Sequence, residues 1–296
     1  DDATYVALDA AAHLVLRSVA DLGDAAQSPE GIYLAYRAVR YLPYAQELLY
    51  PLCPASDAVN VFFTNTGTSH YSPCEESDEP DAGVFHVDNE RGTKGGYSVY
   101  APANRGLTPP LVVALHGGSG HGRSFLWTWL RDARSRGAVV VTPTSCGDTW
   151  ALMEPDADVD NLSAILKSVS NRWKVDPARI LLTGMSDGGT FTYLTGLRSY
   201  SPFTHLAPIS ASFHPMFMEL IPEPSVMERA VYITHGVHDW MFQIDVARMA
   251  NELLSGMGAE VTYREIADLA HTYPREENAL ILDWFLGEAF GVKGTT

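Results

Sequence analysis

The stretch Gly184-Met185-Ser186-Asp187-Gly188-Gly189 decides the fold of this chain. It follows the apolar run 179–183, which is typical of a buried parallel strand, and it precedes 190–196, which can continue as a helix. Between a strand and a helix, a G-x-S-x-G turn needs small flanking residues and holds its serine hydroxyl in the open. The alternative is a glycine-rich turn with an ordinary serine. The rest of the chain decides between the two.

From Leu111 onward, short apolar runs alternate with segments of helical length. The strands are predicted at 111–115, 138–142, 179–183, 206–210, 230–234 and 261–266. Helices are predicted over 159–173 and 242–256, and near 275–290. This alternation predicts an α/β fold, with a mostly parallel central sheet and helices on both faces.

Residues 1–90 are expected to form a helical N-terminal extension that packs on or caps the core, and 91–296 to form the α/β domain. Within the extension, 3–22 predicts one helix and Ser28-Pro29-Glu30 the start of another. The run 58–64 alternates enough to predict a strand, and 97–100 predicts another.

One face of the second helix carries a tyrosine-rich stripe. Its members are Tyr33, Tyr36, Val39 and Arg40. Such a stripe could dock a partner chain, and a homodimer is possible, but it more often packs a helix onto its own domain.

The composition excludes several classes of partner. The 296 residues include 36 acidic and 20 basic side chains, for a net charge of -16, and this surface repels phosphate backbones, so nucleic acid is not expected as a partner. No apolar run reaches about 18 residues, so no membrane span is expected. No Cys/His cluster has zinc spacing, and no metal is expected.

The cysteines leave the compartment open. Cys53 and Cys74 could pair in an oxidising compartment, or these two and Cys146 could all be buried thiols. The spacing of the first two and the absence of an initiator Met favour a secreted or periplasmic origin over a cytoplasmic one.

A nucleophilic serine needs a base and an acid that orients the base. Asp239 lies a few residues beyond the strand at 230–234, and His271 lies in the loop beyond the strand at 261–266. Strand ends of a parallel sheet meet at one edge, so both side chains are expected near Ser186. The order Ser186, Asp239, His271 is that of α/β-hydrolases. His238 is the neighbouring competitor, and we expect it to line the pocket or bond to its own loop.

Donors for the developing oxyanion are predicted in two backbone N–H groups. The strand at 111–115 runs into His116-Gly117-Gly118-Ser119-Gly120, which is how serine hydrolases of this class place an N–H over the nucleophile. We assign this role to Gly118, with the Asp187 N–H as its partner. The Asp187 carboxylate would oppose an oxyanion, so its side chain is expected to point away, towards the N-terminal end of the next helix.

The motifs together resemble a known family. Four segments are similar, in the same order, to motifs of the esterase/poly(3-hydroxybutyrate) depolymerase-like and feruloyl-esterase-like α/β-hydrolases. They are H-G-G-S-G at 116–120, the segment 173–180 leading into the Ser186 turn, H-G-V-H-D at 235–239 and H-T-Y-P at 271–274. The resemblance covers roughly residues 95 to 290. It implies a hydrolase of carboxylic esters that acts through Ser186, His271 and Asp239 and needs no metal or organic cofactor.

The substrate is expected to be a small-molecule or polymeric ester, of a carboxylesterase, feruloyl-esterase or polyester-depolymerase type. Its pocket is predicted from aromatic and Met-rich loops, although the same residues could be ordinary core. The candidates are Trp150, Phe213, His214, Met216 and Trp240. Two alternatives are a serine peptidase of the same fold and a catalytically silent binding protein that acts through its N-terminal helices.

Overall fold

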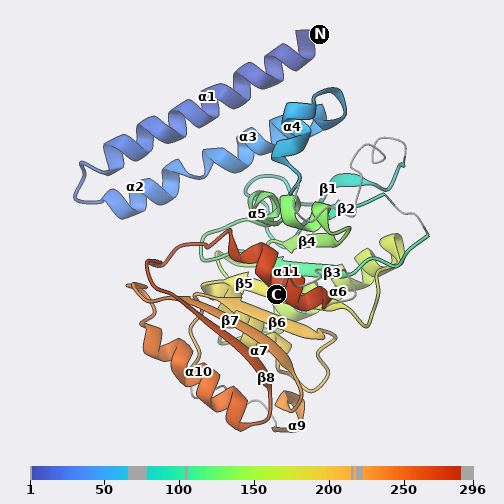
Figure 1. Ribbon diagram of the computed structural model, residues 1–296, viewed down its shortest axis with the longest axis vertical. Helices are drawn as coiled ribbons and strands as arrows, with labels where there is room; N and C mark the ends of the chain where they lie inside the picture. Colours follow the sequence, from blue (N-terminus) through green and yellow to red (C-terminus); the bar gives the residue numbers. More distant parts are fainter. Residues whose placement is uncertain (1, 66–78, 104–105, 215–216, 218–222, 288–296) are drawn as a thin grey trace, which may run out of the picture.

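A computed structural model describes residues 2–65, 79–103, 106–214, 217 and 223–287 (Figure 1). Within this part of the chain, eight strands form one sheet in the order β1-β2-β4-β3-β5-β6-β7-β8. Their bounds are β1 Gly83–Val87, β2 Tyr97–Ala101, β3 Leu111–Leu115, β4 Val139–Pro143, β5 Ile180–Met185, β6 His205–Ile209, β7 Ala230–Gly236 and β8 Glu260–Ile266. The pairs β1–β2 and β2–β4 are antiparallel, and the other pairs are parallel.

Helices cover both faces of the sheet. Leu111 and Val113 of β3 belong to a core cluster with α6 (Asp156–Trp173), α7 (Asp187–Gly196) and α10 (Ile244–Gly256). Val112, which points to the opposite face, packs in a second cluster with α5 (Gly122–Ser135) and α11 (Glu277–Leu286). The central strands are apolar throughout because both their faces are buried. The predicted α/β class is therefore confirmed. One further short helix is α9 (Glu223–Val226).

The N-terminal segment is helical up to residue 62. It consists of α1 (Asp2–Ala25), α2 (Gly31–Ala38), α3 (Tyr41–Leu49), the 3-10 helix η1 (Tyr50–Ala55) and α4 (Asp57–Phe62). Helix α1 runs alongside α2 and α3 at one end of the molecule, and α3 contacts α5 (Figure 1). We call α1 to α3 the N-terminal hairpin.

One expectation about the first 90 residues is wrong. The predicted strand over 58–64 is helix α4, which begins after Ser56 because the Ser56 hydroxyl accepts a hydrogen bond from the Val59 N–H at 3.5 Å. Within residues 1–90, β1 at Gly83–Val87 is the edge strand of the sheet. The boundary at residues 90 and 91 remains a prediction. Cys74 lies outside the described residues, so its pairing with Cys53 also remains a prediction.

The parallel strands point their carboxyl ends towards one edge of the sheet. The loops after β3, β5, β7 and β8 therefore meet there, and these four loops carry Gly118, Ser186, Asp239 and His271. No described helix combines the length and apolarity that a bilayer crossing requires.

Candidate active site

Ser186 occupies a strained turn between β5 and α7. Its backbone has φ 56° and ψ -120°, a region that non-glycine residues rarely adopt. The turn is held by two hydrogen bonds, from the Ser186 N–H to the Ile209 carbonyl at 3.0 Å and from the Thr190 N–H to the Ser186 carbonyl at 2.8 Å. A Cβ on Gly188 would lie 2.5 Å from the His116 carbonyl oxygen, so only glycine fits between the serine turn and the loop after β3.

The structure brings the three residues predicted for the reaction into hydrogen-bond contact. His271 Nε2 lies 3.0 Å from Ser186 Oγ, and His271 Nδ1 lies 2.8 Å from Asp239 Oδ2. Because a carboxylate can only accept, Nδ1 carries the ring proton and Nε2 is left to accept the serine hydroxyl proton. Ser186 is 6% exposed, Asp239 5% and His271 4%. This burial excludes water and so strengthens the hydrogen bonds between them.

The other oxygen of Asp239 is also occupied. Oδ1 accepts the backbone N–H groups of Met241 at 2.9 Å and Phe242 at 2.8 Å, so the carboxylate is fixed in orientation. His235, which the sequence analysis did not place at the site, has its Nε2 3.4 Å from Asp239 Oδ2 and 2.8 Å from the Phe242 carbonyl oxygen. Burial lowers the pKa of His235, which favours its neutral form beside Asp239.

The loop after β3 passes directly over the serine. A Cβ on Gly117 would lie 3.5 Å from Ser186 Cβ. Within the described residues, neither the Gly118 N–H nor the Asp187 N–H donates to a protein acceptor. Two unused donors beside a serine hydroxyl are what an oxyanion requires.

The Asp187 side chain does not point away from this loop, contrary to expectation. Its Oδ2 lies 2.8 Å from where a Cβ on Gly118 would stand, and it accepts the Thr149 hydroxyl at 2.5 Å. The Thr149 hydroxyl thus holds the carboxylate against the glycine loop. A negative charge therefore stands beside the predicted oxyanion donors.

His116 and Trp150 support the glycine loop from beneath. The His116 Nδ1 bonds to the Gly117 carbonyl at 2.8 Å, and its Nε2 accepts the Ser145 N–H at 3.2 Å, so the ring must be neutral to make both bonds. Burial lowers the pKa of His116 to about 4. Trp150 is 2% exposed and donates its Nε1–H to the His116 carbonyl at 2.8 Å.

The predicted pocket residues divide between core and site. Trp150 and Phe213 are wrong as pocket walls, because Trp150 is buried beneath the loop and Phe213 packs in the core against Tyr193, with ring centroids 4.9 Å apart. Trp240 is 46% exposed and its ring centroid lies 6.0 Å from that of His271, where a substrate wall is expected. His214 is exposed, and Met216 lies outside the described residues.

Two further contacts to the site come from Phe242 and Tyr36, and Tyr36 belongs to the tyrosine-rich stripe of the sequence. Phe242 packs its ring edge-on against His271, with centroids 5.4 Å apart. Tyr36, from helix α2, donates its hydroxyl to the His271 carbonyl. His238, the competitor of Asp239, is exposed, and its backbone N–H donates to the Leu269 carbonyl at 2.9 Å.

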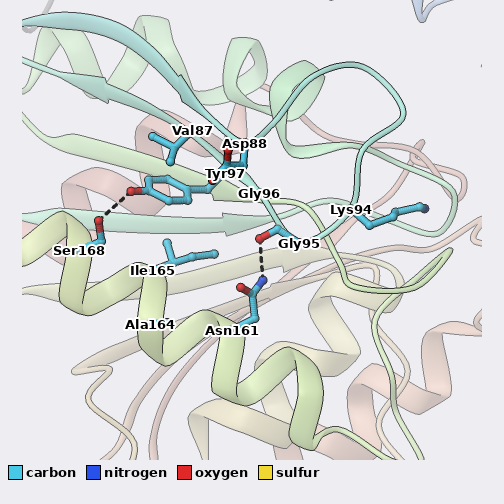
Figure 2. Close-up of a pocket in the computed structure, with 10 residues that line it drawn as sticks. All are labelled: Val87, Asp88, Lys94, Gly95, Gly96, Tyr97, Asn161, Ala164, Ile165 and Ser168. Atoms are coloured by element: carbon cyan, nitrogen blue, oxygen red, sulfur yellow. Dashed lines mark hydrogen bonds between the residues drawn. The ribbon is translucent and has the colours of Figure 1, made fainter.

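A cleft of about 300 Å³ lies elsewhere, between the segment 87–97 and helix α6 (Figure 2). Three of its polar side chains bond within its own walls: Tyr97 Oη lies 2.9 Å from Ser168 Oγ, and Asn161 Nδ2 donates to the Gly95 carbonyl at 2.9 Å (Figure 2). The cleft includes none of the residues around Ser186, so we assign it no part in the reaction. In the described part of the chain, no group of three or more His, Cys, Asp or Glu side chains could hold a metal ion.

Solved structures of known proteins share this architecture. Among solved structures, FphF, a fluorophosphonate-binding serine hydrolase of Staphylococcus aureus, matches with a TM-score of 0.55 at 16% identity, covering 69% of this chain and 97% of that one. A ferulic acid esterase matches with a TM-score of 0.54 at 16% identity, covering 69% and 95% of the two chains. The predicted fold is thus confirmed: this chain has the α/β-hydrolase fold.

The curated relatives of this chain include an esterase. The bifunctional acetylxylan esterase/xylanase XynS20E of Neocallimastix patriciarum is 28% identical over 203 residues, which make up 66% of this chain and 29% of that enzyme. The chain therefore spans less than a third of the length of this curated relative. No protein-family model matches the chain.

Proposed function

We propose that the protein is a serine hydrolase of carboxylic esters that acts through Ser186, His271 and Asp239. One observation carries this proposal: the hydrogen-bonded series from Asp239 through His271 to Ser186, whose serine stands in a strained strand-to-helix turn. Side chains in this geometry turn a weak nucleophile into a strong one. The esterases among the relatives support the same reaction class.

In the acylation half of the reaction, His271 Nε2 accepts the Ser186 proton while Oγ attacks the ester carbonyl. The carbonyl oxygen becomes an oxyanion, which the N–H groups of Gly118 and Asp187 stabilise. His271 then gives its proton to the departing alcohol, and an acyl group remains on Ser186.

In the second half, water takes the place of the alcohol. His271 accepts a proton from the water as it attacks the acyl carbonyl, and returns that proton to Ser186 as the carboxylic acid leaves. Asp239 keeps the imidazole in the correct tautomer and stabilises its charged form. The Met241 and Phe242 N–H groups support this role because they hold the carboxylate in one orientation.

The substrate class follows from chemistry and from the relatives' names. XynS20E is named an acetylxylan esterase and one structural neighbour a ferulic acid esterase, so both names refer to acyl esters. We infer that this protein cleaves esters of small or medium acyl groups, with Trp240 beside His271 as one wall of the substrate site. Whether the alcohol belongs to a small molecule or to a polymer is decided by the assay below.

The test is labelling by a fluorophosphonate probe together with hydrolysis of p-nitrophenyl esters of increasing acyl length. We expect wild-type protein to be labelled, and Ser186→Ala to lose labelling and about 10⁴-fold or more of the ester turnover. Absence of labelling in folded wild-type protein would contradict the proposal. Cleavage of matched p-nitroanilides at rates comparable to the esters would favour the peptidase alternative, and release of acid from acetylated xylan would identify a polymeric substrate.

A further inference from the structure

The N-terminal hairpin contacts both loops that the proposed reaction uses. From α2, Tyr36 donates its hydroxyl to the backbone carbonyl of His271. Just beyond α2, Arg40 Nη2 donates to the backbone carbonyl of Ser119 at 3.4 Å, and Ser119 follows the predicted oxyanion donor Gly118. Residues four apart lie on one side of a helical segment, so this one side faces both the histidine loop and the glycine loop.

We propose that Tyr36 and Arg40 complete the active site, Tyr36 as a positioning residue for His271 and Arg40 as a positioning residue for the glycine loop. The inference rests on the proposed function, because it concerns the base and the oxyanion donors of that reaction. It assigns the N-terminal helices a role in turnover in addition to any role in stability.

His271 needs an external support. It lies between the end of β8 at Ile266 and the start of α11 at Glu277, in a segment without helix or strand. Its Nε2 must stay within hydrogen-bond reach of Ser186 Oγ, and a misplacement of about 1 Å can cost about 10²-fold in rate. The Tyr36 hydroxyl fixes the backbone of the residue whose ring does the chemistry.

The Tyr36 hydroxyl is suited to this task. Burial and the negative charge of Asp239 raise the pKa of Tyr36, so the hydroxyl remains a donor over the working range of a serine esterase. Tyr33, on the same helix, is 67% exposed, and no described contact joins its hydroxyl to the catalytic loops. The two tyrosines therefore form a matched pair for an experiment.

The hairpin is itself attached to the α/β core. Glu47 on α3 accepts Arg123 Nε of α5 at 3.0 Å and Arg91 Nη2 at 3.1 Å. On the outer side, the Arg17 guanidinium of α1 lies over the Tyr41 ring, 4.9 Å from its centroid. These contacts hold α2 in place, so that the Tyr36 hydroxyl can act as a fixed support.

The first experiment compares Tyr36→Phe with Tyr33→Phe. Active sites are counted by stoichiometric fluorophosphonate labelling, and kcat per titrated site, KM and the second-order labelling rate constant are measured on one p-nitrophenyl ester. We expect Tyr36→Phe to lower kcat and the labelling rate constant together, by about 10-fold, because the base is misplaced in both reactions. KM should stay within about two-fold, and Tyr33→Phe should match the wild type.

A purely structural contact would give a different result. Tyr36→Phe would then lower the melting temperature or the titrated fraction while kcat per titrated site kept the wild-type value, and that outcome overturns the inference alone. Absence of labelling and ester turnover in the wild type would overturn the proposed function and this inference with it.

A second pair of variants keeps the inference testable if Tyr36→Phe does not fold. Arg40→Gln and its control Arg37→Gln both change exposed side chains of the same segment. We expect Arg40→Gln to lower kcat per titrated site by about three-fold through the glycine loop, and Arg37→Gln to have no effect. Wild-type kcat per titrated site in both variants would contradict the role of Arg40. If Tyr36→Phe also failed to fold, this result would overturn the proposal.

Discussion

The carboxylate of Asp187 is the least expected side chain at the site. It belongs to the residue whose N–H is the predicted oxyanion donor, and the Thr149 hydroxyl holds it against Gly118. A fixed negative charge near a developing negative charge raises the energy of the transition state. In the proposed reaction, the Asp187 charge thus opposes the oxyanion, unless a substrate group offsets it.

Asp187→Asn is therefore predicted to raise kcat for a neutral p-nitrophenyl ester by about three-fold or more. The amide keeps the size of the side chain and removes its charge, while the backbone N–H stays in place. The measurement is kcat and KM at neutral pH, with Thr149→Val as a control that removes the partner and leaves the charge. A lower kcat/KM that is caused by a higher KM would show instead that the carboxylate binds the substrate.

The burial of His116 predicts how the free energy of unfolding depends on pH. Its pKa is lowered to about 4 by burial, whereas an unfolded histidine has a pKa of about 6.5. Between these values the unfolded chain binds a proton that the folded chain does not, so stability is lost as pH falls from about 6.5 to about 4. The full loss from this group is about 3 kcal/mol.

The check is the free energy of unfolding in urea from pH 7.5 down to 4.5. His116→Asn should be less stable at pH 7.5, because the Ser145 N–H loses its acceptor, and should lose less stability on acidification than the wild type. His13→Asn, at a side chain that is 73% exposed, serves as the control and should keep the wild-type slope. An unchanged slope in His116→Asn would show that His116 does not titrate in this range.

At the scale of elements, the central strands were predictable because burial on both faces makes them continuous apolar runs. The predicted 111–115 coincides with β3, and the five strands predicted after it overlap β4 to β8 with ends shifted by one or two residues. Strand β1 was missed because all five of its residues are only half-buried at the sheet edge. The run 58–64 was misassigned because its β-branched residues resemble a strand, although a serine cap begins a helix there.

At the site too, some residues could be predicted from the sequence and others could not. Ser186, Asp239 and His271 each follow a strand, so topology alone predicts that they meet, and the structure brings them together. Trp150 and Phe213 were misassigned because an aromatic side chain in a core and one in a pocket wall have the same sequence signal. The tyrosine-rich stripe indicates that Tyr36 packs onto the domain, but its bond to His271 depends on how α2 docks and has no local pattern.

At the scale of the whole molecule, the net charge of -16 affects which esters reach the site. A charged protein repels substrates of its own sign over a distance set by the Debye length, which is about 30 Å at 0.01 M salt and about 10 Å at 0.1 M. The proposed activity should therefore depend on salt only when the ester is charged.

For a p-nitrophenyl ester that carries a carboxylate, kcat/KM is predicted to rise several-fold between about 0.01 M and about 0.1 M NaCl. The neutral p-nitrophenyl ester of similar size should change by less than about 1.5-fold over the same range. Initial rates at substrate concentrations far below KM measure both. A parallel response of the two esters would point to an effect of salt on the protein itself.

The bond between Tyr36 and His271 also has a consequence for biosynthesis. The two residues are 235 positions apart in the chain, so a ribosome must make all eight described strands before α2 can meet the histidine. Contacts of such long range form late in folding. A nascent chain halted before residue 271 already contains Ser186 but has no base for it, so the proposed hydrolysis cannot begin until the segment that carries His271 has been made.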